Sequence, residues 1–265
     1  MSVKGVTGKR ARRPRSYVRV SGRDAADYLQ RVLSNDIAAL DRGDSCEALL
    51  LTPKARVIAT LTVWRRGEED FLLLSEPELG EAVRSQLLRG RFAARCEIEA
   101  EEHRSMIVFG NGASGLPNRD YGLPAFEVLD AAAEPELEPE ELELLRIRAA
   151  TPRFGREIDD RVLPAEAGLV DRAVSFTKGC YPGQEPIARL HHRGHANRGL
   201  RVLRIEAEES PPYDAELMLD GKVVGRVTSA ARDEDGAIVA LAYVRREVPD
   251  EAELRVGSSA ARRLH

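Results

Sequence analysis

The sequence has few cysteines, no excess of either charge and no long hydrophobic run, and each absence excludes a class of protein. Its three cysteines contain no C-x-x-C pair, so neither a disulfide framework nor a zinc ribbon is expected. Lys and Arg number 40 against 44 Asp and Glu, which argues against a protein that coats nucleic acid with its whole surface. No apolar run approaches the roughly 20 residues needed to cross a bilayer.

The chain is nevertheless long and apolar enough for a packed core. It has 265 residues, of which 43% are hydrophobic and 32% charged, well outside the range of disordered proteins. The N-terminus is basic, but no apolar segment follows it, so we expect no secretory signal. The sequence therefore predicts a reduced, cytoplasmic protein that does not cross a membrane.

The order of periodic segments indicates an α+β region followed by a mostly β domain. Apolar residues recur at helical spacing between Asp24 and Leu33, and three β-like runs follow within residues 48–74. After residue 200, five short strand-like runs are separated by Gly, Asp and Pro, which is typical of a small barrel or sandwich. We place the boundary near Arg198.

The first 15 residues contain several Lys and Arg but no acidic residue. We expect them to form a solvated, poorly ordered tail. The alternative is an arm that binds phosphate groups, because clustered cations gain affinity by releasing condensed counterions.

The densest chemistry lies in residues 178–185, which read KGCYPGQE. Glycines on both sides of Cys180 let the backbone turn tightly and leave the thiol approachable. A cation such as Lys178 or Arg189 would favour the thiolate form, provided that the side chains also meet in space. The alternative is a small buried cysteine, as most cysteines are. The polar setting favours the reactive thiol here, whereas Cys46 and Cys96 are expected to be buried.

A histidine cluster follows directly, with His191, His192 and His195 around Arg193. Together with Cys180 these side chains could offer nitrogen and sulfur ligands to zinc or iron. No second cysteine lies nearby, however, and Arg193 would repel a cation. We therefore expect a solvated basic loop or an anion contact, and we predict no metal site.

The octapeptide, with Ala188, Arg189, Arg193 and Gly194 after it, resembles the signature of the YgfZ family. The similarity spans nearly the whole chain. Further matching segments are Leu29–Gln30, Leu33–Asp36, Leu51–Lys54, Gly155–Ile158, Pro164–Leu169 and Val224–Ser229. Ala55 departs from the pattern, since a glycine is usual there. Members of the family bind folate, are linked to iron–sulfur cluster maintenance and tRNA modification, and are relatives of the glycine-cleavage T-protein, an aminomethyltransferase.

The resemblance implies a T-protein-like cloverleaf of α/β subdomains around a central channel that accepts tetrahydrofolate. A small C-terminal β-barrel would close one side of this channel. The corresponding domains are a disordered basic tail over residues 1–15, a folate-binding region of two subdomains over 16–197 and the barrel over 198–265.

The resemblance also indicates where catalytic chemistry has been lost. T-proteins carry an aspartate at the end of the second strand, in the pattern G-G-x-x-D-D-L, close to the reacting nitrogen of folate. Here Ala59 and Thr60 take both acidic positions, and neither can exchange a proton at neutral pH. Aminomethyl transfer is therefore not expected from these positions. Asp36 is a nearby acid that could substitute.

Folate contacts are implied residue by residue. T-proteins use a glutamate in a G-Y-E-I strand to accept paired hydrogen bonds from the pterin ring, and Glu127 lies in a similar segment. A carboxylate suits the adjacent N–H donors of an aminopyrimidine edge, although Glu127 could instead face outward from an alternating strand. The further candidates for the folate site are Asn35, Leu50, Arg146 and Lys178. The motif residues are Lys178, Gly179, Cys180, Tyr181, Gly183, Gln184, Glu185 and Arg189.

Three functions follow as hypotheses. The preferred one is a folate-binding accessory factor for iron–sulfur proteins such as radical tRNA methylthiolases, in which the thiolate of Cys180 acts on a transferred group, a metal or a partner. The second is an enzyme, a folate-dependent one-carbon transferase that uses another base, with Asp36 as the candidate. The third is a binding module in which the basic tail and residues 178–198 dock tRNA while folate is incidental.

Overall fold

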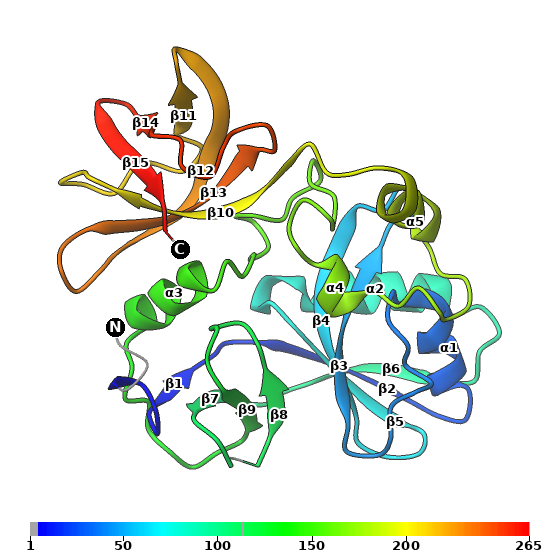
Figure 1. The fold of residues 1–265 in the computed structure, drawn as a ribbon. Coiled ribbons are helices and arrows are strands. Elements are labelled where there is room, and N and C mark those ends of the chain that lie inside the picture. The colour runs from blue at the N-terminus through cyan, green and yellow to red at the C-terminus, as the bar shows by residue number, and fades with distance from the viewer. Residues whose placement is uncertain (1–4, 113, 265) are drawn as a thin grey trace.

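The computed structural model describes residues 5–112 and 114–264 of the protein. Within these ranges the strands form a five-stranded sheet, a four-stranded sheet and a closed barrel. Figure 1 shows the two open sheets in the lower part of the molecule and the barrel above them. The predicted α+β class with a small C-terminal barrel is confirmed. None of the described helices has the length and apolar character that a membrane span requires.

The five-stranded sheet is antiparallel, with its strands in the order β3-β4-β5-β2-β6. Its strands are β2 (Ser16–Ser21), β3 (Ser45–Leu51), β4 (Val57–Arg65), β5 (Asp70–Ser75) and β6 (Glu97–Glu101). Its helical elements are α1 (Ala25–Val32), the short 3-10 helix η2 (Pro77–Leu79) and α2 (Gly80–Gly90). The helices cover one face, where Leu29 and Val83 join Leu73 in one core cluster. Leu72 and Leu74 pack on the other face, which explains why β5 reads as a continuous apolar run.

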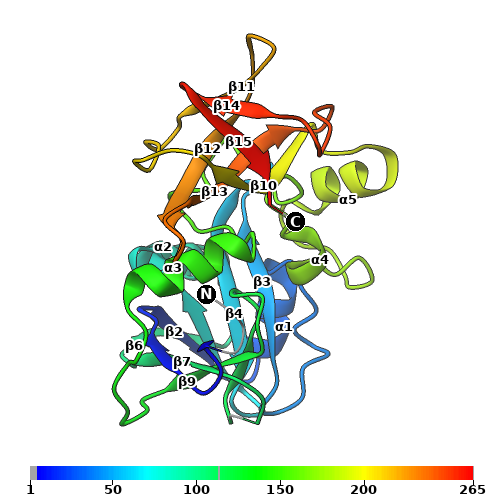
Figure 2. The same cartoon turned by 60° about the vertical axis from the view of Figure 1, so that its left-hand side comes forward.

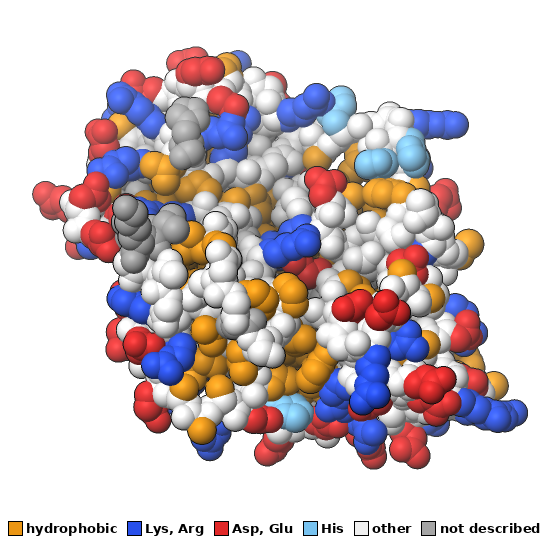
Figure 3. All heavy atoms as spheres, turned by 60° about the horizontal axis from the view of Figure 1, so that its bottom comes forward, with side chains coloured by type: hydrophobic (Ala, Val, Ile, Leu, Met, Phe, Trp, Pro, Cys, Tyr) orange, Lys and Arg blue, Asp and Glu red, His pale blue; other side chains and the backbone are white. Residues whose placement is uncertain are grey.

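The four-stranded sheet has the order β1-β7-β9-β8. Its strands are β1 (Arg10–Arg12), β7 (Ser105–Phe109), β8 (Leu116–Asn118) and β9 (Ala125–Leu129). Helix α3 (Pro139–Arg148) covers one face, where Leu142 and Leu145 meet Phe109. The other face carries half-buried residues such as Phe126. Figure 3 shows hydrophobic side chains gathered on the side of the molecule that is lowest in Figure 1.

The prediction of a disordered basic tail over residues 1–15 is wrong for residues 5–15. Strand β1 pairs with β7, and Val6 and Ala11 are buried in the same cluster as Phe109. The pairing with β7 and these two buried side chains hold the segment on the sheet edge. Residues 1–4 lie outside the described residues.

The barrel closes in the order β10-β13-β12-β11-β14-β15. Its strands are β10 (Arg198–Ile205), β11 (Glu216–Leu219), β12 (Lys222–Arg232), β13 (Ile238–Arg245), β14 (Leu254–Val256) and β15 (Ser259–Arg263). Strand β13 is buried along nearly its whole length. One face of β13 fills the barrel, and on the other face Val239 and Leu241 pack against Leu144 and Ile147 of α3. Figure 2 shows α3 lying between the barrel and the four-stranded sheet.

The segment between α3 and the barrel is irregular apart from α4 (Val170–Ala173) and α5 (Gln184–Arg193). Its residues Ile158, Tyr181 and Ile187 share a core cluster with Leu51 of β3 and Tyr243 of the barrel. This connector therefore holds the five-stranded sheet and the barrel in a fixed relation.

Glu157 is the polar centre of this connection and is completely buried. Its carboxylate accepts hydrogen bonds from Nη1 of Arg146 at 3.0 Å, Oγ of Ser229 at 2.7 Å and the backbone N–H of Arg153 at 3.0 Å. Its backbone carbonyl accepts one from Oη of Tyr243 at 2.9 Å. Helix α3, the connector and the barrel thus share one buried carboxylate.

Glu157→Ala should lower the free energy of unfolding by about 3–5 kcal/mol, because it leaves the guanidinium of Arg146 buried with one partner fewer. Chemical denaturation measures this loss. The matched control is Glu253→Ala, which breaks an exposed pair with Arg262 and should cost less than about 1 kcal/mol. Equal losses for the two variants would show that Glu157 does not hold the barrel in place.

Candidate functional site

A polar cavity lies where the two open sheets, α3 and α4 meet. Five arginines line it, namely Arg13, Arg15, Arg119, Arg146 and Arg172. Three acids line it as well, namely Glu47, Glu76 and Asp120. Its free space is ≈ 50 Å³, whereas pockets for small molecules usually hold roughly 300–1,000 Å³. In this arrangement of side chains the cavity has room for a few water molecules only.

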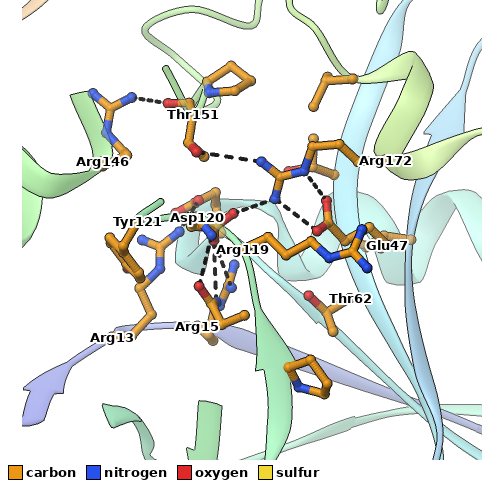
Figure 4. A pocket seen from close by; sticks show the side chains of 17 residues that line it. Arg13, Arg15, Glu47, Thr62, Arg119, Asp120, Tyr121, Arg146, Thr151 and Arg172 are labelled. Carbon is orange, nitrogen blue, oxygen red and sulfur yellow. Dashed lines mark hydrogen bonds and ion pairs between the residues drawn. The ribbon is translucent and has the colours of Figure 1, made fainter. Parts of the chain in front are cut away.

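Arg172 of α4 joins the two sheets across the cavity. Its guanidinium contacts the carboxylate of Glu47 on β3 at 2.6 and 2.8 Å and that of Asp120, which follows β8, at 2.8 Å. Although burial opposes its charge, Arg15 and Arg172 hold the pKa of Asp120 below its ordinary value. Figure 4 shows this network from close by.

Glu127 and Arg15 form a deeply buried pair beside the cavity. Nε and Nη2 of Arg15 each donate to one carboxylate oxygen of Glu127 at 2.9 Å, and Oγ of Ser105 also donates to this carboxylate. The side chains of Arg15 and Glu127 are 6% and 1% exposed. Although burial opposes both charges, the pairing lowers the pKa of Glu127 and raises that of Arg15. Glu127 therefore points inward, and the alternative of an outward-facing strand residue is wrong.

Arg146 lines the cavity but has no donor to spare. Its five N–H groups are used by Glu143 through Nε and Nη2, by Ser229 through Nη2, and by Glu157 and the carbonyl of Thr151 through Nη1. Arg119, in contrast, lies exposed at the cavity and forms no ion pair with another described residue. A ligand carboxylate would therefore find a free guanidinium at Arg119 rather than at Arg146.

Strand β4 brings no acid to the cavity. Thr60 and Thr62 line it together with Leu61, while Ala59 is buried in the core under the helices. Asp36 lies in the turn after α1, where its carboxylate accepts a hydrogen bond from Gln30 at 3.0 Å, and it is not among the described residues that line the cavity. Leu50 is a core residue with 3% exposure.

Lys178 and Asn35 meet at the end of α1, away from the cavity. The ammonium group of Lys178 donates to the carbonyl oxygens of Gln30, Leu33 and Asn35, the last two at 2.6 and 2.9 Å. Burial lowers the pKa of Lys178 to about 8. The side chain thus satisfies carbonyl groups at the C-terminus of α1, where a cation also suits the helix dipole.

Cys180 is exposed, so the alternative of a buried cysteine is wrong for this residue. Cys96 is buried as expected, whereas Cys46 is half-buried rather than buried, although burial still raises the pKa of Cys46 to about 12. Cys180 is thus the most approachable of the three thiols. Cys180 is not among the described residues that line the central cavity. Arg15 does line it and binds the carboxylate of Glu127, whereas Cys180 has no such link to the cavity among the hydrogen bonds of the described residues.

The motif also fixes a close approach of two segments that are distant in the sequence. Gly183 precedes α5 with φ +83°, and a Cβ there would lie 2.7 Å from the carbonyl oxygen of Thr52 and 3.0 Å from Cα of Ala55. Ala55 itself adopts φ +58°, which explains why a glycine is the easier residue at its position. The turn after β3 and the start of α5 are therefore packed backbone to backbone.

Gly183→Ala should lower the free energy of unfolding by about 2 kcal/mol or more, because a Cβ at this positive φ is strained and also meets Thr52 and Ala55. The control is Gly179→Ala in the same motif, where a Cβ would meet nothing within 4 Å. Urea unfolding of both variants checks the difference. A Gly183→Ala protein as stable as Gly179→Ala would contradict the close packing.

Sequence reasoning missed most of the residues that build the cavity. Arg15 was placed in the tail, and Glu47, Asp120 and Arg172 were not singled out. Glu47 could have been noticed, because it is a charged residue directly before the apolar run Ala48–Leu51 in β3. Arg172 and Asp120 lie in turn-rich segments, where a charged residue is ordinary and gives no signal.

Comparisons with known proteins agree with this architecture. The chain is 27% identical to the tRNA-modifying protein YgfZ of Edwardsiella ictaluri, over 93% of this chain and 87% of the relative. It is 26% identical to the tRNA-modifying protein YgfZ of Pectobacterium carotovorum subsp. carotovorum, over 90% and 84%. No protein-family model matches the chain.

A solved structure shares the fold. The glycine cleavage system aminomethyltransferase T from Bartonella henselae superposes with a TM-score of 0.82 and 21% identity, covering 99% of this chain and 87% of that one. At this identity the match establishes the fold alone.

Proposed function

We propose that this chain, which belongs to the YgfZ family and has the T-protein fold, binds a folate at its central cavity and supports tRNA modification. The observation that carries the proposal is the buried carboxylate of Glu127 beside the cavity. It already holds a planar N–C–N donor edge, that of the Arg15 guanidinium, through two parallel hydrogen bonds. An aminopyrimidine ring presents neighbouring N–H donors of the same geometry, so the chemistry of the site suits a pterin.

Different residues at the cavity would bind different parts of the folate. Glu127 would hold the pterin edge, and Arg119 is the cation free to meet the carboxylates of the folate tail. A bound tetrahydrofolate supplies nitrogen atoms that carry one-carbon groups. Entry of the ring requires side chains of the cavity to move, because the free space is ≈ 50 Å³.

An accessory role fits the cavity better than group transfer does. A general base must lie within hydrogen-bond reach of the proton that it removes. Thr60 stands in the cavity wall where the T-proteins carry an acid, and Asp36 lies outside the cavity. Neither Thr60 nor Asp36 can therefore serve as the base that the one-carbon transferase hypothesis requires.

The RNA-docking hypothesis loses part of its basis. Arg13 and Arg15 turn inward to Glu76 and Glu127 rather than outward to solvent. Two cations of the basic segment are thereby withdrawn from solvent, and phosphate binding gains affinity with each cation that contributes. Arg189 and Arg193, within residues 178–198, remain exposed.

We place the second functional element at Cys180. Its exposure and its separation from the cavity suit action on a partner macromolecule rather than on folate. Iron–sulfur proteins such as radical tRNA methylthiolases are the partners that we propose, in the cytoplasm.

Folate binding is tested by titrating the purified protein with tetrahydrofolate in a calorimeter. We expect saturable binding that weakens about tenfold or more in Glu127→Gln, because an amide cannot accept two N–H bonds as a carboxylate does. Glu253→Gln, far from the cavity on β14's side of the barrel, is the control and should bind like the wild type. Equal affinity of the two variants for tetrahydrofolate, or no saturable binding by the wild type, would count against the proposal.

The role of Cys180 is tested in a deletion strain whose methylthiolated tRNA nucleosides are quantified by mass spectrometry. Cys180→Ala should fail to restore them, whereas Cys46→Ala, which removes a half-buried thiol outside the motif, should restore them. Full rescue by Cys180→Ala would remove the thiol from the mechanism.

A further inference from the structure

The guanidinium of Arg15 stands where a ligand of Glu127 would have to bind. Arg15 lies in the short connection between β1 and β2, at the junction of the two open sheets. Nε and Nη2 use both carboxylate oxygens of Glu127 at 2.9 Å. Ser105 adds a third hydrogen bond to the same carboxylate, and Asn118 approaches it at 3.5 Å. Little acceptor capacity is left for a second planar donor.

The charge on Arg15 has another partner within reach. Nη2 of Arg15 lies 3.7 Å from Oδ2 of Asp120, too far for a hydrogen bond but close enough for an ion pair. A small rotation of the side chain would shorten this contact while it breaks the two bonds to Glu127. Because Asp120 also lines the cavity, the guanidinium could leave Glu127 without becoming a buried cation that has no partner.

We propose that Arg15 is an internal occupant of the ligand site, which a ligand with an N–C–N donor edge displaces from Glu127 to Asp120. This inference rests on the proposed function, since it names the residue that controls access to the same carboxylate. Both states keep Arg15 paired, so they are the two arrangements that a competing ligand can shift.

Two properties of binding follow. Apparent affinity is reduced by the fraction of molecules in which Arg15 occupies Glu127, as for any ligand that needs a minor state. Selectivity rises at the same time, because a heterocycle without paired N–H donors gains nothing at Glu127 that would compensate for the displaced guanidinium.

The experiment compares the wild type with Arg15→Met and Arg15→Lys. The probes are pterin and lumazine, which has an oxygen in place of the 2-amino group of pterin. We expect Arg15→Met to bind pterin about tenfold or more tighter, since a single charge-assisted hydrogen bond is worth at least that factor. Arg15→Lys keeps the charge but not the planar edge and should lie between. Lumazine binding should not tighten.

The matched control is Arg19→Met on β2. Arg19 pairs with Asp70 on the outside of the sheet and does not line the cavity, so this variant should bind pterin like the wild type. If the wild type binds pterin and neither Arg15 variant binds it tighter, the inference fails while the proposed function stands. Equal tightening for lumazine also overturns the inference, because it would show that only space was limiting. If no variant binds pterin, both fail.

A second readout is the melting temperature, which requires no folate and also reports whether the variants fold. Methylguanidinium at low millimolar concentration should raise the melting temperature of Arg15→Ala and weaken its pterin binding, because the ion replaces the missing side chain. It should do neither for Arg19→Ala. No effect on Arg15→Ala would contradict a site that accepts N–C–N donors in general.

Discussion

The meeting of the two open sheets depends on a chain of buried and half-buried ion pairs at their junction. Glu127 and Arg15 are followed by Asp120, Arg172 and Glu47, so that the charges alternate from β9 across to β3. Removing such groups from water is costly, and each is tolerated only because its neighbour has the opposite sign. An apolar cluster that includes Leu72, Leu74 and Leu116 also holds the sheets together, but apolar contact is not directional and fixes their relative position less closely than paired charges do.

This network also decides what kind of site the junction can be. Ordinary ligand pockets are mostly apolar with a few polar groups, whereas five arginines and three acids line this cavity. On the proposal made above, a ligand would enter by exchanging one charged partner for another. Strand β4 contributes Thr60 and Thr62 to the cavity wall, so the acids that line the cavity, Glu47, Glu76 and Asp120, come from other segments.

The octapeptide motif has structural and surface roles that lie side by side. Lys178 satisfies the carbonyl groups at the end of α1, and Gly183 permits contact with the turn after β3. Between them the chain presents Cys180 to solvent. The rigid attachment on both sides explains how an exposed thiol keeps a defined position although it lies on a loop.

Local pattern by itself indicated α1, the strands β3, β4 and β5, the change to a small barrel or sandwich near residue 198 and the special character of the octapeptide, whereas it gave no sign of β1, α4 or α5. The indicated features depend on neighbours along the chain, through hydrophobic periodicity, turn residues and glycines. Only the tertiary structure decided which charged residues meet. Arg15 lies 112 positions from Glu127, and Glu47 lies 125 from Arg172. No periodicity relates such pairs, because the partner of a buried charge is chosen by the packing of the sheets and not by its spacing in the chain. For the same reason the sequence predicted Arg15 to lie in a solvated tail. In the folded chain its side chain is buried, pairs with Glu127 and lines the cavity between the two sheets.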